Sequence, residues 1–244
     1  MFNRKKILSD LDESRLKLDL HISTGSTNDL CKEGQINREF LAIASDIQTR
    51  GRGRQGKKWS SPPGNISFSI AYLEKNIETP TSLVAGVIAR LAICSALGIE
   101  DIKLKWPNDL IFKNKKIGGI LVERDIQGNE IKTIVGIGIN LALSEKEPWW
   151  GDLSSFNSSS ARDDIINNII KGFYDFIDGG LSNWQDLWNL SCVHLNKNIL
   201  IKNNNVVINE GIFIGINNKG ALLLKVNKEI KEYAFGEISI EGIY

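Results

Sequence analysis

The amino-acid sequence predicts an α+β protein, in which a mixed β-sheet with packed helices is followed by a small β-barrel-like unit. Three observations predict this class. Apolar runs of strand length alternate with helical stretches up to residue 193, residues 81–97 carry apolar side chains at helical spacing, and only short strands follow from about residue 196. We therefore expect one large domain over residues 1–195 and a small one over residues 196–244.

The strands of the larger domain are predicted from two kinds of pattern. Residues 65–73 alternate in polarity, as in a strand with one buried face, whereas residues 40–45 form a continuous apolar run. Four further strands are expected at residues 102–106, 110–112, 117–124 and 131–141. The tight turns between them are expected at Pro107-Asn108-Asp109, Lys113–Lys116 and Gln127-Gly128-Asn129.

Pro80 and Gly98 delimit the longest predicted helix, residues 81–97. A shorter helix is expected to start in residues 26–34, where Ser26 and Asp29 form a Ser-x-x-Asp variant of the capping pattern. Two more helical stretches are predicted at about residues 161–178 and 182–193.

The C-terminal unit is predicted to contain strands alone. They are expected at residues 198–202, 206–216, 221–226 and 232–240, separated by Asn203–Asn205, Asn217–Gly220 and Asn227. A unit of this size buries too little apolar surface to be stable alone, so we expect it to pack on the main domain.

Composition and charge exclude several classes of protein. Thirty Lys and Arg residues against 29 Asp and Glu leave a net charge of +1, whereas nonspecific nucleic-acid binding requires a basic excess. Three distant cysteines, Cys31, Cys94 and Cys192, predict reduced thiols in a cytoplasmic protein. The two histidines leave almost no material for a catalytic triad, and neither a signal peptide nor a membrane span is expected.

Residues 47–65 form a basic loop with five cations between Arg50 and Lys58 and three interleaved glycines. A solvated hairpin, an anion clamp and a nucleic-acid-binding arm all agree with this composition. Arg52 and Arg54 offer planar forks to phosphate oxygens, and glycines let backbone N–H groups approach an anion closely. The neutral net charge and the lack of aromatic residues besides Trp59 disfavour the nucleic-acid arm.

The spacing Gly51-x-Gly53-x-x-Gly56 matches a dinucleotide-binding fingerprint only superficially. A true fingerprint follows a strand and opens a helix that receives the pyrophosphate. Here Lys57-Lys58-Trp59 and a Ser-Pro-rich stretch follow, and the next element alternates as a strand. We therefore reject a Rossmann fold.

Three other motifs combine cations with glycine-softened strands. Lys105-Trp106-Pro107-Asn108-Asp109 is either an ordinary turn or a site where Asp109 holds Mg²⁺ beside substrate phosphates. Lys116 precedes an apolar strand that contains Gly118 and Gly119. Gly136-Ile137-Gly138-Ile139-Asn140 is a second apolar strand with two glycines, and it ends in a polar residue. A β-bulge explains such glycines as well as a close ligand does. Together the motifs describe a shallow apolar slot beside an anion site.

In combination, these motifs resemble those of the biotin protein ligases. The resemblance rests on Ser26-Thr27-Asn28, Gln48 with Gly51–Gly56 and Trp59, Lys105–Asp109, Lys116–Glu123, Gly136–Asn140, Gly215-Ile216, Gly220–Leu224 and Gly236–Ser239. It implies the fold shared by class II aminoacyl-tRNA synthetases and biotin–lipoate ligases, with an SH3-like C-terminal domain. It also implies an enzyme that joins biotin to a lysine of the biotin carboxyl carrier protein of acetyl-CoA carboxylase, using ATP with Mg²⁺ and a biotinyl-5′-AMP intermediate.

The resemblance implies a role for each matching residue. Lys116, Arg52 and Arg54 are expected to be catalytic. Contacts to biotin are expected from Ser26, Thr27, Gln48, Gly51, Arg52, Lys116, Gly119, Leu121, Gly136 and Ile139. The nucleotide is expected to meet Arg52, Arg54, Trp59, Asn108 and Asn140, and Asp109 is the expected Mg²⁺ ligand.

Two departures from the family pattern and several alternatives remain. Larger members carry an N-terminal DNA-binding domain, and only residues 1–20 precede the matching region, so no DNA binding is expected. Glu241 stands where a basic residue is common, and Arg50 adds a cation of unassigned role. A lipoate-type ligase, a nucleic-acid-binding module and a biotin-binding protein without turnover are the alternatives. An exposed sheet edge is expected to pair with a carrier or with a second copy.

Overall fold

The computed structural model describes residues 1–74, 80–128, 130–145, 147–156, 158–203, 206–234 and 238–241. Several positions named above lie outside the described residues: Asn129, Asn204, Asn205, Gly236, Glu237 and the side chain of Glu241.

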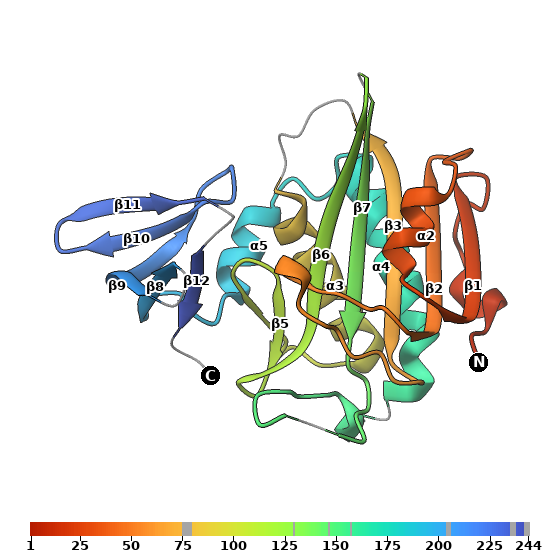
Figure 1. The fold of residues 1–244 in the computed structure, drawn as a ribbon, viewed down its shortest axis with the longest axis horizontal. Helices are drawn as coiled ribbons and strands as arrows, with labels where there is room; N and C mark the ends of the chain where they lie inside the picture. Colours follow the sequence, from red (N-terminus) through yellow and green to blue (C-terminus); the bar gives the residue numbers. More distant parts are fainter. Residues whose placement is uncertain are drawn as a thin grey trace.

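A seven-stranded mixed sheet is the centre of the fold (Figure 1). Its strands run in the order β1-β2-β3-β7-β6-β5-β4; β1 pairs with β2 in parallel and all other neighbours are antiparallel. Their bounds are β1 Leu16–Thr24, β2 Phe40–Gln48, β3 Ile66–Glu74, β4 Lys103–Lys105, β5 Asp109–Phe112, β6 Lys115–Gln127 and β7 Glu130–Ile139. The predicted mixed sheet is confirmed.

The predicted helices are found as α2, α3, α4 and α5. Helix α3 spans Thr81–Leu97 and ends at Gly98, whose φ of 65° is left-handed and suits glycine. Helix α2 covers Thr27–Glu33, and the Ser26 hydroxyl accepts a hydrogen bond from the Asp29 amide at 3.5 Å. The other helices are α1 Arg4–Ile7, α4 Arg162–Ile177 and α5 Trp184–Ser191.

The two faces of the sheet are covered differently. Helices α3 and α4 pack on one face over the main core, which contains Phe68, Ile120 and Ile137. On the other face, α2 covers a smaller apolar cluster around Cys31 and Ile134. The connection from β2 to β3 crosses this second face in front of β7 and β6 (Figure 1). The second face is therefore only partly closed by a helix, and the basic loop lies over the remainder.

The C-terminal residues form a second, five-stranded antiparallel sheet in the order β11-β10-β9-β8-β12. Its strands are β8 Asn198–Asn203, β9 Val206–Ile216, β10 Leu222–Val226, β11 Glu229–Tyr233 and β12 Ile238–Glu241. Phe213 and Leu224 join the main core beside Trp188. The Trp106 indole donates a hydrogen bond of 3.0 Å to the Gly220 carbonyl. The small sheet thus packs on the larger unit, as its size predicts.

Three elements differ from the predictions: strand β1 and helix α1 were not predicted, and the last predicted strand is divided. Residues 16–24 form β1, which was not predicted, although apolar and polar residues alternate from Leu16 to Ile22 as in a strand with one buried face. One predicted strand, residues 232–240, is divided between β11 and β12, which lie at opposite edges of the small sheet. The Gly51–Gly56 segment opens only a short 3₁₀ turn, Arg54–Gly56, so the rejection of a dinucleotide fingerprint is confirmed. Among the described residues, no helix is long and apolar enough to cross a membrane.

His194 predicts how stability depends on pH. Its ring is fully buried beside Phe213, and within the described chain neither ring nitrogen has a hydrogen-bond partner. Burial, with the positive charges of Lys105 and Lys197, lowers the pKa of His194 to about 4. The unfolded chain, with a histidine pKa of about 6.5, takes up a proton that the folded chain refuses. The free energy of unfolding should therefore fall as the pH drops from about 6.5 to about 4.

Urea unfolding at pH 7.5 and pH 5 tests this expectation. His194→Leu replaces the ring with an apolar side chain of similar size that takes up no proton. This variant should lose less stability between the two pH values than the natural protein does. Equal losses in the two proteins would show that His194 does not control this dependence.

Candidate active site

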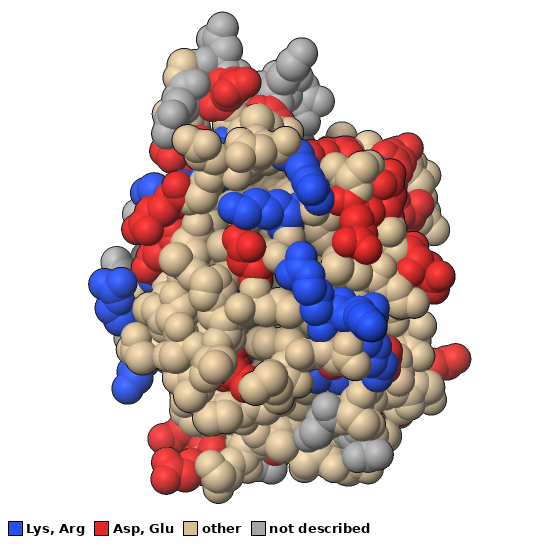
Figure 2. Space-filling view, turned by 90° about the vertical axis from the view of Figure 1, so that its right-hand side faces the viewer, with Lys and Arg blue, Asp and Glu red and all other residues tan. Residues whose placement is uncertain are grey.

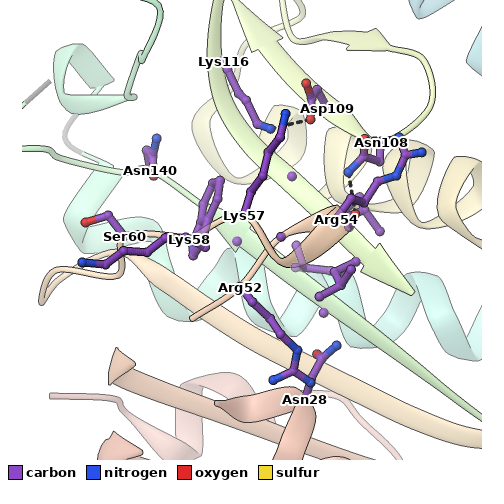
Figure 3. A pocket seen from close by; sticks show the side chains of 18 of the residues that line it. Asn28, Arg52, Arg54, Lys57, Lys58, Ser60, Asn108, Asp109, Lys116 and Asn140 are labelled. Carbon is purple, nitrogen blue, oxygen red and sulfur yellow. Dashed lines mark hydrogen bonds and ion pairs between the residues drawn. The ribbon is translucent and has the colours of Figure 1, made fainter. Parts of the chain in front are cut away.

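A cavity of about 750 Å³ lies between the basic loop, α2 and the second face of the seven-stranded sheet. Figure 3 shows side chains of the loop and of the sheet converging on it. Most residues predicted from the resemblance line this one cavity, namely Ser26, Thr27, Gln48, Arg52, Arg54, Trp59, Asn108, Asp109, Lys116, Gly119, Leu121, Gly136 and Asn140. Segments far apart in the sequence are therefore brought together.

Glycines form the floor of the cavity. Gly119 of β6 lies directly opposite Gly138 of β7, and Gly136 lies two residues away on the same face. The Trp59 ring sits on Gly138 so closely that a Cβ there would approach it to 2.6 Å. A Cβ on Gly136 would overlap the side chain of Asn28. These two glycines are needed for close packing by other side chains, and no bulge interrupts β7 here.

The α2 end of the cavity is a network of neutral hydrogen-bonding groups. Gln48 Oε1 accepts from the Thr27 amide at 2.9 Å and from the Thr27 hydroxyl at 3.1 Å. Gln48 Nε2 donates to the Ser61 hydroxyl at 3.0 Å. The buried Ser69 hydroxyl links Thr27 Oγ1 at 2.7 Å and Asn28 Oδ1 at 2.6 Å. This end offers amide and hydroxyl groups to a polar, uncharged ligand.

Arg52 reaches toward α2 and contacts two carboxylates. Its Nη2 lies 2.7 Å from Asp29 Oδ1 and 2.9 Å from Glu123 Oε2. The hydrogen bond to Asp29, followed by that to Glu123, raises the pKa of Arg52 above its usual value. Asn28 Nδ2 donates to the same Glu123 carboxylate at 2.6 Å. Figure 3 shows Arg52 directed to Asn28 and away from Lys116 and Asp109.

The β5 end of the cavity carries the other cations. Lys116 Nζ lies 2.6 Å from Asp109 Oδ1 and 5.8 Å from the centre of the Trp59 ring. Arg54 Nη1 donates to Asn108 Oδ1 at 3.5 Å, and Asn108 Nδ2 donates to the Ile120 carbonyl at 2.8 Å. Burial lowers the pKa of Arg54. This end is suited to an anionic ligand.

The segment after β7 forms the rim. The Lys116 amide donates to the Trp149 carbonyl at 3.0 Å, and the Gly151 amide donates to the Lys116 carbonyl at 2.8 Å. Asn140 Nδ2 donates to the Gly151 carbonyl at 3.1 Å. Trp149 and Trp150 line the cavity and were not predicted as site residues, although a tandem aromatic pair in a polar loop was a usable signal.

Two predicted residues do not line the cavity. Gly51 packs against the Trp59 carbonyl, which a Cβ would approach to 2.6 Å. Ile139 is fully buried in the main core, because strand alternation turns it to the face opposite Gly138. Conversely, Asn28 and Glu123 had no predicted role, and Glu123 is linked to Arg52 across 71 positions of sequence.

Comparison with known proteins agrees with this site. The model of the Biotin/lipoate A/B protein ligase family matches residues 21–140, and that of the Biotin protein ligase C terminal domain matches residues 194–240. A slot for a polar uncharged group beside a cationic compartment, on a mixed sheet with a small β-domain, agrees with the ligase class that both family models describe. The chain belongs to the biotin protein ligase family.

Individual relatives cover nearly the whole chain. The bifunctional ligase/repressor BirA of Escherichia coli K12 is 30% identical over 99% of this chain and 79% of its own length. The biotin–[acetyl-CoA-carboxylase] ligase of Paracoccus denitrificans is 26% identical over 80% of this chain and 92% of its own. The biotin protein ligase from Aquifex aeolicus, solved with biotin and ATP, superposes with a TM-score of 0.72 at 26% identity, covering 93% of this chain and 98% of that one.

The packing of Trp59 on Gly138 can be tested by substitution. Gly138→Ala should lower the free energy of unfolding by about 1–3 kcal/mol, because the added methyl group overlaps the indole ring. Gly86→Ala is the matched control, since its Cβ would meet only Leu104 at 3.6 Å within a helix that favours alanine. Urea titration of both variants measures the difference, and equal stability would contradict the proposed role of Gly138.

Proposed function

We propose that this protein activates biotin with MgATP to form biotinyl-5′-AMP and pyrophosphate, and then transfers biotin to a lysine of a biotin carboxyl carrier protein. One observation carries the proposal: a compartment of amide and hydroxyl groups and a cationic compartment share a floor that contains Gly119, Gly136 and Gly138. Biotin combines an uncharged ureido head group with a carboxylate, so it matches both compartments in turn. The family membership and the Aquifex aeolicus complex with biotin and ATP support the assignment.

In this proposal the biotin head group lies at the α2 end, where Ser26, Thr27 and Gln48 supply donors and acceptors. Leu121 and the glycines of β6 and β7 shape the slot along which the side chain of biotin extends. Its carboxylate then reaches Lys116. The orientation follows from charge, because the reacting anion is placed beside cations and the uncharged ring beside amides.

The first step requires a carboxylate oxygen to attack the α-phosphorus while pyrophosphate leaves. Both reactants are anionic, so their repulsion is the main obstacle. Lys116 and Arg54 oppose it with fixed positive charge, and each charge-assisted hydrogen bond contributes roughly 1.5–3 kcal/mol. Asn108, Asn140 and Trp59 would contact the nucleotide in this arrangement.

Asp109 would hold Mg²⁺ when MgATP binds. Asp109 is the one carboxylate among the described residues that line the cavity. Mg²⁺ prefers one or two carboxylates together with substrate phosphates. The ion would supply further neutralisation of phosphate charge. Asp109 would also keep the Lys116 ammonium in place, given their separation of 2.6 Å.

In the second step the amine of the carrier lysine attacks the carbonyl carbon of the anhydride, forms an amide and releases AMP. The basic loop would shield the adenylate from water until the carrier arrives. We propose acetyl-CoA carboxylase as the source of the carrier, as the name of the Paracoccus denitrificans relative suggests. We further propose residues 1–195 as the catalytic domain, residues 196–244 as an SH3-like domain, and a cytoplasmic location in keeping with three free cysteines.

Pyrophosphate–ATP exchange tests the first step directly. With MgATP, exchange should appear on adding biotin and not on adding lipoate. Exchange with lipoate alone would keep the adenylating chemistry and replace the substrate. Exchange with neither would refute the proposal, and salt-sensitive oligonucleotide binding would then favour a nucleic-acid module. The mixture of acidic and basic groups on the face in Figure 2 disfavours that outcome.

Lys116→Ala should reduce biotin-dependent exchange at least about 100-fold, because it removes the cation at the reacting carboxylate. Lys115→Ala is the matched control, since Lys115 is the neighbouring lysine on β6 and its side chain is exposed. Comparable activity in the two variants would show that Lys116 is not catalytic. Circular dichroism should show both variants folded.

A further inference from the structure

The acidic pair Asp29 and Glu123 has no part in the chemistry above, yet it contacts a residue of the basic loop. Building on the proposed function, we propose that Glu123 is a positioning residue. Together with Asp29 it holds the basic loop over the α2 end through Arg52, and it keeps phosphate groups away from that end. Arg52 is then a clamp for the loop and for biotin, and phosphate is handled by Arg54 and Lys116.

The geometry of the contact supports a positioning role. Arg52 Nη2 lies 3.0 Å and 2.9 Å from the two oxygens of Glu123, and 2.7 Å from Asp29 Oδ1. Arg52 Nη1 donates to the Ser26 hydroxyl at 3.3 Å. The contacts with Ser26, Asp29 and Glu123 therefore fix the orientation of the Arg52 guanidinium. Its side chain and those of both acids are about a third exposed, so the pairs fix direction more than they add stability.

Glu123 also acts on a second group. Its Oε2 accepts from Asn28 Nδ2, and Asn28 is buried against Gly136 and Ser69. The carboxylate thus joins the loop, the start of α2 and strand β6 at one point. Glu123 lies two residues beyond Leu121 on the same face of β6, which places this junction at the end of the biotin slot.

The charges at the two ends of the cavity differ in sign. Beside the α2 end, Asp29 and Glu123 lie behind the cavity lining and face the Arg52 guanidinium, so this group of three carries one net negative charge. At the β5 end, Lys105, Lys116, Arg54 and Lys57 stand against Asp109, which leaves three net positive charges. Figure 3 shows Lys57 directed toward the Asp109 end. A triphosphate is attracted to the β5 end and repelled from the α2 end, so ATP does not compete for the place of the biotin ring.

Steady-state exchange with Glu123→Ala tests the clamp. The KM for biotin should rise by roughly tenfold, because a partly exposed charge-assisted contact is lost, while the KM for ATP changes less than about twofold. Preformed biotinyl-5′-AMP should leave the variant faster by a similar factor, about tenfold, since the loop is no longer held. Glu123→Gln keeps an oxygen acceptor and should lose less. Asp125→Asn, two residues along β6 and outside the cavity lining, is the matched control.

A double-mutant cycle separates positioning from a general structural effect. If Glu123 acts through Arg52, adding Glu123→Ala to Arg52→Ala should change the KM for biotin by less than about twofold. Fully additive effects, or an equal rise in the KM for ATP, would overturn the proposal. If Glu123→Ala does not fold, Glu123→Gln replaces it in the cycle. The natural protein, measured in parallel, tests the proposed function separately. If it shows no biotin-dependent exchange, the proposed function is refuted. The role of Glu123 is then judged by how fast biotinyl-5′-AMP leaves the natural protein and the variants.

Discussion

The site depends on one constraint, a strip of strands β6 and β7 in which Gly119, Gly136 and Gly138 carry no side chain on the face that meets the loop. Cross-strand pairing puts Gly119 opposite Gly138, with Ser67 of β3 and Asp109 of β5 continuing the row. Any side chain at Gly136 or Gly138 would collide with Asn28 or Trp59. The bare strip lets a loop, a helix end and a ligand approach the same sheet, and it does so without a break in the backbone ladder that carries the core on the other side.

The charged side chains of this cavity act through their positions, because the chain has no large excess of either charge. The chain as a whole is nearly neutral, and the cations of the basic loop do not act as one patch. Arg52 is committed to Asp29 and Glu123, whereas Arg54 and Lys57 are directed to the end that holds Lys116. In the proposed function, the acids beside Arg52 would let one short loop contact an uncharged ring at one end and a polyphosphate at the other. An unopposed cluster of cations would bind phosphate along its whole length.

Local patterns in the sequence were sufficient for most elements and insufficient for the contacts between them. Helix α3 follows from Pro80, Gly98 and apolar spacing alone, because these signals are local. Strand β1 was missed although its alternation of apolar and polar residues is a local signal, and the pairing that stabilises it lies in β2. The motifs of the resemblance found most lining residues. Glu123 could not be found from a local pattern because its contact with Arg52 spans 71 positions, and strand alternation turns the side chain of Ile139 to the core face.

The loop itself combines ends anchored to the β1–β2 pair with a tip that is held by local hydrogen bonds, such as that from the Gly53 amide to the Lys57 carbonyl at 2.7 Å. Backbone hydrogen bonds from Thr49 to Thr24 and from Arg50 to Gly25 extend the β1–β2 pairing, and Trp59 donates to the Gly51 carbonyl. At the tip, Gln55 and Gly56 have φ values of 54° and 71°, and a Cβ on Gly56 would meet no atom within 4 Å. Opening therefore costs least at the tip, and the side-chain contacts of Arg52 resist movement of the segment between tip and anchors. In the proposed two-step reaction, a loop built in this way would let pyrophosphate leave at the β5 end while Arg52 keeps the α2 end covered over the retained adenylate.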